Sequence, residues 1–239
     1  MEVYHRATSD PTRREGGGPT EANDRVAMRT VIFDMDGVIV DSEPYSMQAL
    51  VDVLRDHGVD PTAEELRRSY GRRITEDFAD YFTRYGVTAD LEAAVARKRA
   101  RYYQLATGNL RPFPGVLALL DRLRAKRYRL GLASSGDREK VAFSIRALVL
   151  DGVFETVVTG DEITHSKPNP EIYLMASRRL GVDPVDCLAI EDAPNGVQAA
   201  KGAGMRCIGV TNSVSRKQLE GADLIVDSLA DDLSAMLLL

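Results

Sequence analysis

The sequence has few of the residues that build disulfide frameworks or imidazole metal sites. It contains 2 cysteines, Cys187 and Cys207, and 3 histidines. Both cysteines lie in apolar runs typical of core strands, and we interpret them as buried thiols in a reducing compartment. None of these side chains is spaced as a metal ligand. The sequence therefore indicates neither a disulfide-stapled secreted domain nor a metal site of the zinc type.

Long apolar runs and a strong excess of one charge are also missing. No apolar run approaches the roughly 18 residues of a membrane span. The formal net charge is −5, so we expect no membrane and no nucleic-acid partner. With 239 residues, of which 44% are hydrophobic and 28% charged, the chain has the composition of a globular cytoplasmic protein. We expect a monomer with one large domain and a smaller one.

The chain divides into three parts by composition. Residues 1–27 have almost no apolar periodicity, which predicts a disordered tail. Residues 28–43 and 112–239 form the predicted core, and residues 44–111 form a predicted all-helical domain inserted after the first strand. The periodicity of the insert predicts helices over residues 43–57, 62–70, 74–85 and 88–106.

From residue 112 onward, helical and strand patterns alternate. Strands are predicted over residues 31–33, 128–133, 154–158, 186–190, 205–210 and 224–226, with helices over 115–126, 137–148, 169–180 and 194–203. Such alternation predicts right-handed crossovers and a mainly parallel sheet covered on both faces. The predicted fold class is thus α/β, with a Rossmann-like core and a small helical domain.

Polar residues follow four of the predicted strands. Asp34 and Asp36 follow the first, Ser134 and Ser135 the second, Asp161 and then Lys167 the third, and Glu191 and Asp192 the fourth. The carboxyl ends of parallel strands meet at one edge of a sheet, where open α/β folds bind their ligands. We therefore expect these side chains to converge.

These segments resemble, in order, the four motifs of the haloacid dehalogenase superfamily of phosphotransferases. The motifs are Asp34-Met35-Asp36-Gly37-Val38, Ala133-Ser134-Ser135-Gly136, Lys167-Pro168 and Glu191-Asp192. The resemblance covers residues 30 to the last strand. It implies that the helical insert is the small cap found in β-phosphoglucomutase-like and phosphoglycolate-phosphatase-like members.

Four carboxylates at one edge would repel each other unless a cation neutralised them. Mg²⁺ fits, because it takes one or two carboxylates and completes its shell with waters and substrate phosphate. We predict Asp34 and Asp192 as direct ligands, the Asp36 backbone carbonyl as a third, and Glu191 acting through a water. In the alternative interpretation, Glu191 and Asp192 cap the helix that begins at Pro194.

The predicted reaction is phosphoryl transfer. Asp34 is the candidate nucleophile, giving an aspartyl-phosphate intermediate, and Asp36 is the candidate acid and base. Lys167 would supply a point charge for the phosphate. Ser134 and Ser135 would bind it through a hydroxyl and backbone N–H groups; capping of the next helix is the alternative for Ser134.

We expect the substrate to be a small phosphorylated metabolite, such as a sugar phosphate. Basic residues of the helical insert, namely Arg72, Arg73, Lys98 and Arg99, are candidate substrate contacts, although a solvated helix face is an equal alternative for the last two. The first competing function is a sugar phosphomutase. Such mutases usually carry a histidine where this chain has Ser46, which disfavours that function. A dehalogenase would usually lack Asp36, and a non-catalytic member would normally lack one of the four motifs.

Overall fold

The computed structural model describes residues 29–69 and 74–237, so the predicted tail over residues 1–27 lies outside the described residues. All strand pairs are parallel, and the sheet has the order β3-β2-β1-β4-β5-β6. Its strands are β1 Thr30–Phe33, β2 Arg129–Ala133, β3 Thr156–Val158, β4 Cys187–Glu191, β5 Arg206–Val210 and β6 Leu224–Val226. The predicted α/β fold class is confirmed.

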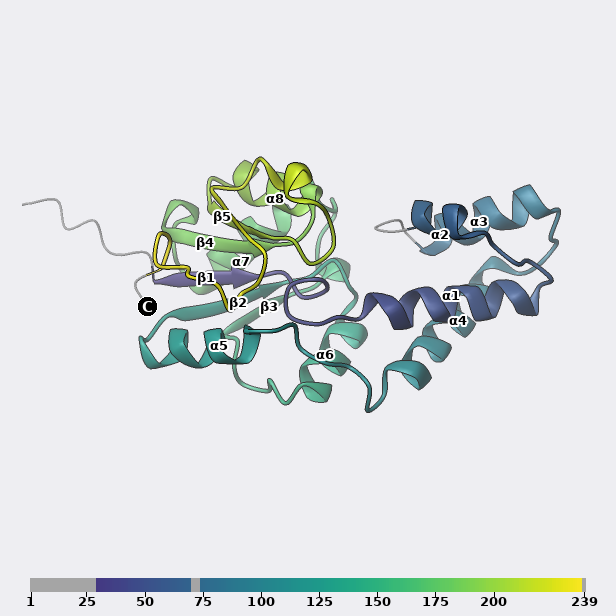
Figure 1. Ribbon diagram of the computed structural model, residues 1–239, viewed down its shortest axis with the longest axis horizontal. Helices are drawn as coiled ribbons and strands as arrows, with labels where there is room; N and C mark the ends of the chain where they lie inside the picture. Colours follow the sequence, from purple (N-terminus) through teal and green to yellow (C-terminus); the bar gives the residue numbers. More distant parts are fainter. Residues whose placement is uncertain (1–28, 70–73, 238–239) are drawn as a thin grey trace, which may run out of the picture.

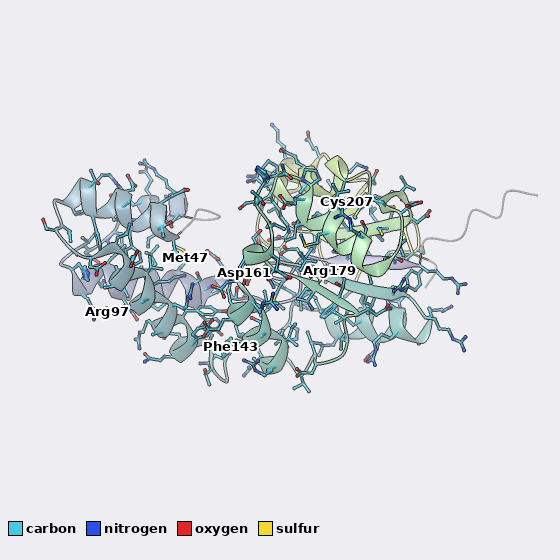
Figure 2. The ribbon with its side chains drawn as sticks, turned by 180° about the vertical axis from the view of Figure 1, so that it is seen from behind. Met47, Arg97, Phe143, Asp161, Arg179 and Cys207 are labelled. Atoms are coloured by element: carbon cyan, nitrogen blue, oxygen red, sulfur yellow. The ribbon has the colours of Figure 1, made fainter. Side chains whose placement is uncertain are left out.

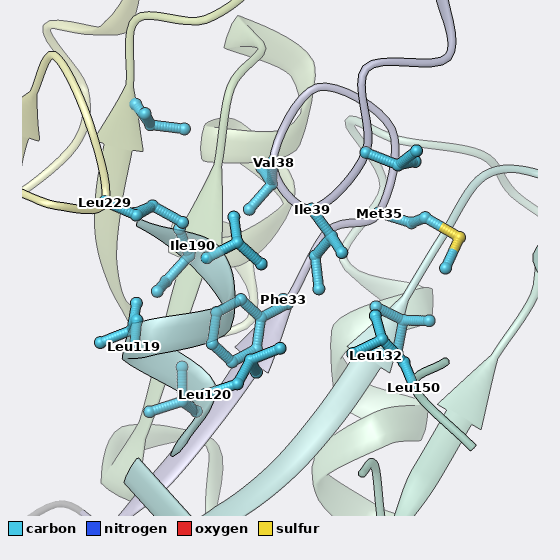
Figure 3. Packing of buried hydrophobic residues seen from close by; sticks show 14 of the residues in the cluster. Phe33, Met35, Val38, Ile39, Leu119, Leu120, Leu132, Leu150, Ile190 and Leu229 are labelled. Atoms are coloured by element: carbon cyan, nitrogen blue, oxygen red, sulfur yellow. The ribbon is translucent and has the colours of Figure 1, made fainter. Parts of the chain in front are cut away.

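Helices cover both faces of the sheet (Figure 1). One face packs against α5 Val116–Ala125 and α6 Arg138–Ala147, and the other against α7 Glu171–Leu180 and α8 Pro194–Gly202. The central strand β1 supplies both cores, because Val31 and Phe33 point to the first face and Ile32 to the second. Figure 3 shows Phe33 packed among the side chains of the first face. Each large side chain buried in this way contributes roughly 1.5–3 kcal/mol.

The helices that follow β1 form a separate body, here called the helical unit, which lies beside the sheet (Figure 1). It consists of α1 Glu43–Asp56, α2 Ala63–Ser69, α3 Ile74–Tyr85 and α4 Leu91–Ala106. It has its own hydrophobic cluster, which includes Leu50, Leu54, Phe78 and Tyr81. None of the helices in the described part of the chain is long and apolar enough to cross a membrane.

Most predicted elements agree with the structure to within a few residues. The start of α4 was predicted at residue 88 but lies at Leu91, because Asp90 is the N-cap and its side chain accepts hydrogen bonds from the backbone N–H groups of Glu92 and Ala93. Three 3₁₀ turns were not predicted: η1 Gly160–Glu162, η2 Pro184–Asp186 and η3 Arg216–Leu219. Such short turns carry no hydrophobic periodicity that a sequence pattern could reveal.

Helix α4 of the helical unit contacts helix α6 of the core. The rings of Tyr103 and Phe143 meet edge to face with their centroids 4.9 Å apart. Beside them, Nη2 of Arg99 lies 3.0 Å from Oδ2 of Asp137, the N-cap residue of α6. An aromatic contact and an ion pair thus join the two bodies next to the carboxyl edge of the sheet.

Candidate active site

The register of the sheet places the first and fourth motifs side by side. Phe33 at the end of β1 pairs with Leu132 on β2 and with Ile190 on β4. The next residues along these strands, Asp34 and Glu191, therefore emerge at the same level of the same edge. The strand order changes direction between β1 and β4, which is where ligands bind in folds of this kind.

Three carboxylates meet at this edge. Asp34, Glu191 and Asp192 each offer an oxygen, and these oxygens all lie within 4.8 Å of one another. The three residues are only 7%, 1% and 6% exposed. Helix α8 begins at Pro194 with Ala193 as its N-cap and no side-chain cap, so the alternative that Glu191 or Asp192 caps this helix is wrong. The three carboxylates thus face one another and do not cap the helix.

Two glycines make the close approach of these carboxylates possible. A Cβ atom at Gly37 would lie 1.8 Å from Oδ2 of Asp192, and the φ of Gly37 is +84°. A Cβ atom at Gly196 would lie 2.0 Å from Oε1 of Glu191. Any side chain at either position would push a carboxylate out of the cluster. These glycines are therefore part of the site; Gly37 belongs to the first motif, whereas Gly196 was not singled out from the sequence.

The Lys167 ammonium group supplies positive charge to this carboxylate cluster. Its Nζ lies 2.5 Å from Oδ1 of Asp34 and 2.6 Å from Oε1 of Glu191, and it donates to the carbonyl oxygen of Ala133 at 3.2 Å. The ring of Tyr173 covers the same ammonium group, 5.0 Å from Nζ to the centroid, and its hydroxyl donates to Oε1 of Glu191 at 2.6 Å. Sequence reasoning missed Tyr173, because its helical spacing marks only a core position.

The charges of this cluster are not balanced. Burial, followed by repulsion from Glu191, raises the pKa of Asp192 from 3.8 to about 7. Burial also raises the pKa of Asp34, although Lys167 opposes that shift. Burial alone would lower the pKa of Lys167, but Asp34 and Glu191 outweigh it and raise the pKa. Buried, crowded oxygen ligands of this kind fit a hard divalent cation such as Mg²⁺.

Asp36 does not share this cluster. Its two carboxylate oxygens are held by different groups: Ser42 Oγ donates to Oδ1, and Lys140 Nζ donates to Oδ2 at 2.8 Å. Burial would raise the pKa of Asp36, but Lys140 and these hydrogen bonds outweigh it and lower the pKa. The role of its backbone carbonyl as a metal ligand stays a prediction. Lys140 was not identified from the sequence, since it lies in a helix with no motif of its own.

Ser134 follows β2 and Asp161 follows β3, and both side chains bond nearby backbone N–H groups. Ser134 is buried, and its Oγ accepts a hydrogen bond from the backbone N–H of Gly136 at 3.1 Å. Asp137, and not Ser134, caps α6. Asp161 was expected to join the other carboxylates, but its Oδ1 accepts hydrogen bonds from Thr159 Oγ1 and from the backbone N–H of Arg138. That expectation is wrong, because local turn and cap contacts hold Asp161 away from the cluster.

Among the candidate substrate contacts, Arg72 and Arg73 lie outside the described residues, whereas Lys98 and Arg99 are on α4. Lys98 Nζ donates to Ser46 Oγ at 2.8 Å. Arg99 lines an open depression of about 470 Å³ between α4 and α6, which it shares with Asp161. In Figure 2 the labelled Asp161 lies where the helical unit approaches the sheet. A substrate role for these residues stays a prediction.

Comparison with known proteins identifies the family. Residues 31–210 match the haloacid dehalogenase-like hydrolases. The chain belongs to this family. It is 34% identical over 189 residues to a phosphorylated carbohydrates phosphatase of Thermotoga maritima, covering 79% of this chain and 88% of the relative. It is 33% identical over 214 residues to β-phosphoglucomutase of Bacillus subtilis, covering 85% and 91%.

A solved structure shows the same architecture. CbbY from Rhodobacter sphaeroides, crystallised with phosphate, superimposes with a TM-score of 0.77 at 29% identity, covering 87% of this chain and 98% of that protein. The resemblance inferred from the four motifs is confirmed, as is the assignment of the chain as a haloacid dehalogenase-like phosphatase.

Proposed function

We propose that this protein is a Mg²⁺-dependent phosphomonoesterase that hydrolyses a small phosphorylated metabolite, specifically a sugar phosphate. The observation that carries the proposal is the cluster of Asp34, Glu191 and Asp192 with Lys167 at the carboxyl edge of the sheet. A buried nucleophile next to a fixed ammonium group and a set of metal ligands is the arrangement that phosphoryl transfer requires.

In the proposed reaction, the Asp34 carboxylate attacks phosphorus and becomes an aspartyl phosphate, while the substrate alcohol leaves. Lys167 would offset the charge of the equatorial phosphate oxygens. Its Nζ lies 2.5 Å from Oδ1 of the nucleophile Asp34. The backbone N–H groups after Ser134 and Ser135 would bind the same oxygens. Mg²⁺, held by Asp34, Asp192 and the Asp36 carbonyl, with Glu191 acting through a water, would supply charge neutralisation when bound.

Asp36 is the proposed acid and base. An in-line attack places the leaving oxygen on the side of phosphorus opposite Asp34. Asp36 lies two residues further along and is bonded to Ser42, at the start of the helical unit. In its protonated form it would protonate the leaving alcohol, and as the carboxylate to which Ser42 and Lys140 donate it would take a proton from the water that cleaves the aspartyl phosphate.

The helical unit is the proposed cap, over residues 44–111, with the core formed by residues 28–43 and 112–239. Lys98 and Arg99 on α4 would help set specificity when the cap covers the substrate. The Thermotoga relative named for phosphorylated carbohydrates supports a sugar phosphate as substrate. We propose a monomer that acts in the cytoplasm.

A phosphomutase is the second candidate, and its support is the Bacillus β-phosphoglucomutase relative. The chain has Ser46 where such mutases usually have a histidine, and the Ser46 hydroxyl accepts a hydrogen bond from Lys98. A mutase must hold its aspartyl phosphate away from water. A serine hydroxyl at this position, unlike the histidine of the mutases, offers no group that transfers protons near neutral pH.

The test is a phosphate-release assay over a panel of hexose phosphates, pentose phosphates and phosphoglycolate, with Mg²⁺ or with EDTA. We expect steady release from sugar phosphates only with Mg²⁺, and none from Asp34→Asn, whose far-UV circular dichroism should match the wild type. If the protein isomerises β-glucose 1-phosphate, and only when a bisphosphate activator is added, it is a mutase instead. Wild-type turnover in Asp34→Asn would refute the nucleophile.

A further inference from the structure

Lys140 contacts both the core and the helical unit. It lies in the first turn of α6, and its Nζ is 2.8 Å from Oδ2 of Asp36. The same Nζ lies 5.5 Å from the centroid of the Tyr102 ring on α4. The Lys140 side chain is 27% exposed and that of Asp36 is 31% exposed. This ion pair therefore lies at the boundary between the two bodies.

The backbone at Lys140 is itself fixed. Asp137 is the N-cap of α6, and its Oδ1 accepts a hydrogen bond from the backbone N–H of Lys140 at 2.8 Å. The other oxygen of Asp137 is paired with Arg99 of α4 at 3.0 Å. Lys140 therefore extends from a helix start that is attached to the helical unit. Its ammonium group is held by a carboxylate on one side and by an aromatic face on the other.

Asp36 depends on such contacts for its orientation. It receives none of the contacts of the cluster around Asp34, because Lys167 bonds only Asp34 and Glu191 among the carboxylates of the described residues. Its Oδ1 is bonded to Ser42 and its Oδ2 to Lys140. With either contact removed, the carboxylate could rotate about its side-chain torsions. The two donors hold Asp36 as a carboxylate, which is the form that takes a proton from the water that cleaves the aspartyl phosphate. This base must lie within hydrogen-bond reach of that water, so rotation of the carboxylate would slow the step.

We propose that Lys140 is a positioning residue for Asp36 in its role as the base that activates water. Together with Ser42 it fixes the Asp36 carboxylate toward the helical unit, and through Tyr102 and Arg99 it links this orientation to the position of α4. The inference rests on the proposed phosphatase function and adds to it a residue that lies outside the four motifs.

The experiment compares Lys140→Met and Lys140→Arg with the wild type. Lys201→Met is the matched control, because Lys201 also forms an ion pair, with Asp223 at 2.7 Å, but away from the carboxylate cluster. Two substrates are used: the sugar phosphate that the wild type hydrolyses fastest, and 4-nitrophenyl phosphate. The nitrophenolate group leaves without a proton, so single-turnover release of nitrophenolate does not require the acid.

For Lys140→Met we expect kcat on the sugar phosphate to fall about tenfold to a hundredfold, within the range that acid–base help supplies. KM should change less than about threefold, and single-turnover nitrophenolate release should also change less than about threefold, because neither depends on the base that activates water for the second step. Lys140→Arg should recover most of kcat, and Lys201→Met should match the wild type.

Three results would overturn the inference: wild-type kcat in Lys140→Met, equal losses on both substrates, or a rise in KM alone, which would indicate direct substrate binding. Failure of the proposed function itself looks different. In that case the wild type releases no phosphate from any sugar phosphate, whereas failure of this inference leaves an active wild type.

Discussion

Asp192→Asn is expected to stabilise the metal-free protein at pH 8. The pKa of Asp192 is raised from 3.8 to about 7 in the folded state, first by burial and then by Glu191. An acid with a raised folded pKa binds its proton more tightly in the folded than in the unfolded state. The stability is therefore fully present below about pH 4 and is lost as the pH rises to about 7.

The size of this effect follows from the two pKa values. At about 1.4 kcal/mol per pH unit, the difference between 3.8 and about 7 corresponds to roughly 4 kcal/mol of lost stability at pH 8. Asn keeps the shape of the side chain and carries no charge. Metal-free Asp192→Asn should thus exceed the wild type by about 2–4 kcal/mol at pH 8 and match it within about 1 kcal/mol at pH 4.

Urea unfolding followed by circular dichroism, in EDTA between pH 4 and pH 8, measures both proteins. Acids with a lowered pKa change the stability only at the acid end of this range, and they do so equally in both proteins. Glu162, for example, has its pKa lowered to about 2, first by its bond with Arg179, so its contribution is complete above about pH 5. The control is Asp223→Asn, which loses the ion pair with Lys201 and should be less stable than the wild type.

Added Mg²⁺ should reverse the order of the two proteins. A ligand at a thousand times its Kd stabilises the folded state by about 4.1 kcal/mol, which exceeds the wild-type deficit of about 2–4 kcal/mol, and only the wild type keeps its full set of carboxylates. The reasoning fails if the metal-free wild type is equally stable at pH 5 and pH 8, or if Asp192→Asn is the less stable protein at pH 8 without metal.

Two further substitutions test the packing around the cluster. Gly37→Ala should abolish turnover and weaken Mg²⁺ binding measured by calorimetry, because its Cβ would lie 1.8 Å from Asp192; Gly58→Ala has a comparable φ of +74° but nothing within 4 Å, and should remain active. Equal activity of both variants would contradict this account. Tyr173→Phe should lower the free energy of unfolding by about 1.5–3 kcal/mol, because it removes a buried hydrogen bond to the charged Glu191. A change below about 0.5 kcal/mol in urea unfolding would show that this hydroxyl bond is not important.

The sequence allowed the fold and three of the four expected carboxylates of the cluster, Asp34, Glu191 and Asp192, to be predicted for one physical reason. Strand residues such as Val31 and Ile32 are buried on both faces, and the acids that follow them interrupt the apolar pattern abruptly. Register then brings Asp34 next to Glu191.

Contacts that depend on side-chain direction could not be predicted in this way. Tyr173 and Lys140 lie on helices whose apolar spacing reveals only which face is buried. Asp161 was expected near the other carboxylates because it follows a strand, but its carboxylate, in a 3₁₀ turn, bonds Thr159 and the backbone N–H of Arg138 instead. The positions of such side chains depend on tertiary packing.

The charge of the cluster connects its stability with its chemistry. Asp34, Glu191 and Asp192, when ionised, together with Lys167 leave a formal charge of −2, whereas Asp36 is neutralised separately by Lys140. A phosphate dianion would be repelled from such a site, since charges at these distances interact by several kcal/mol at the dielectric of a protein surface. A divalent cation brings the cluster to zero, and a dianion can then approach Asp34. Burial, with repulsion from neighbouring carboxylates, raises the pKa of Asp34 and Asp192. The same buried negative charge would make the proposed hydrolysis depend on Mg²⁺.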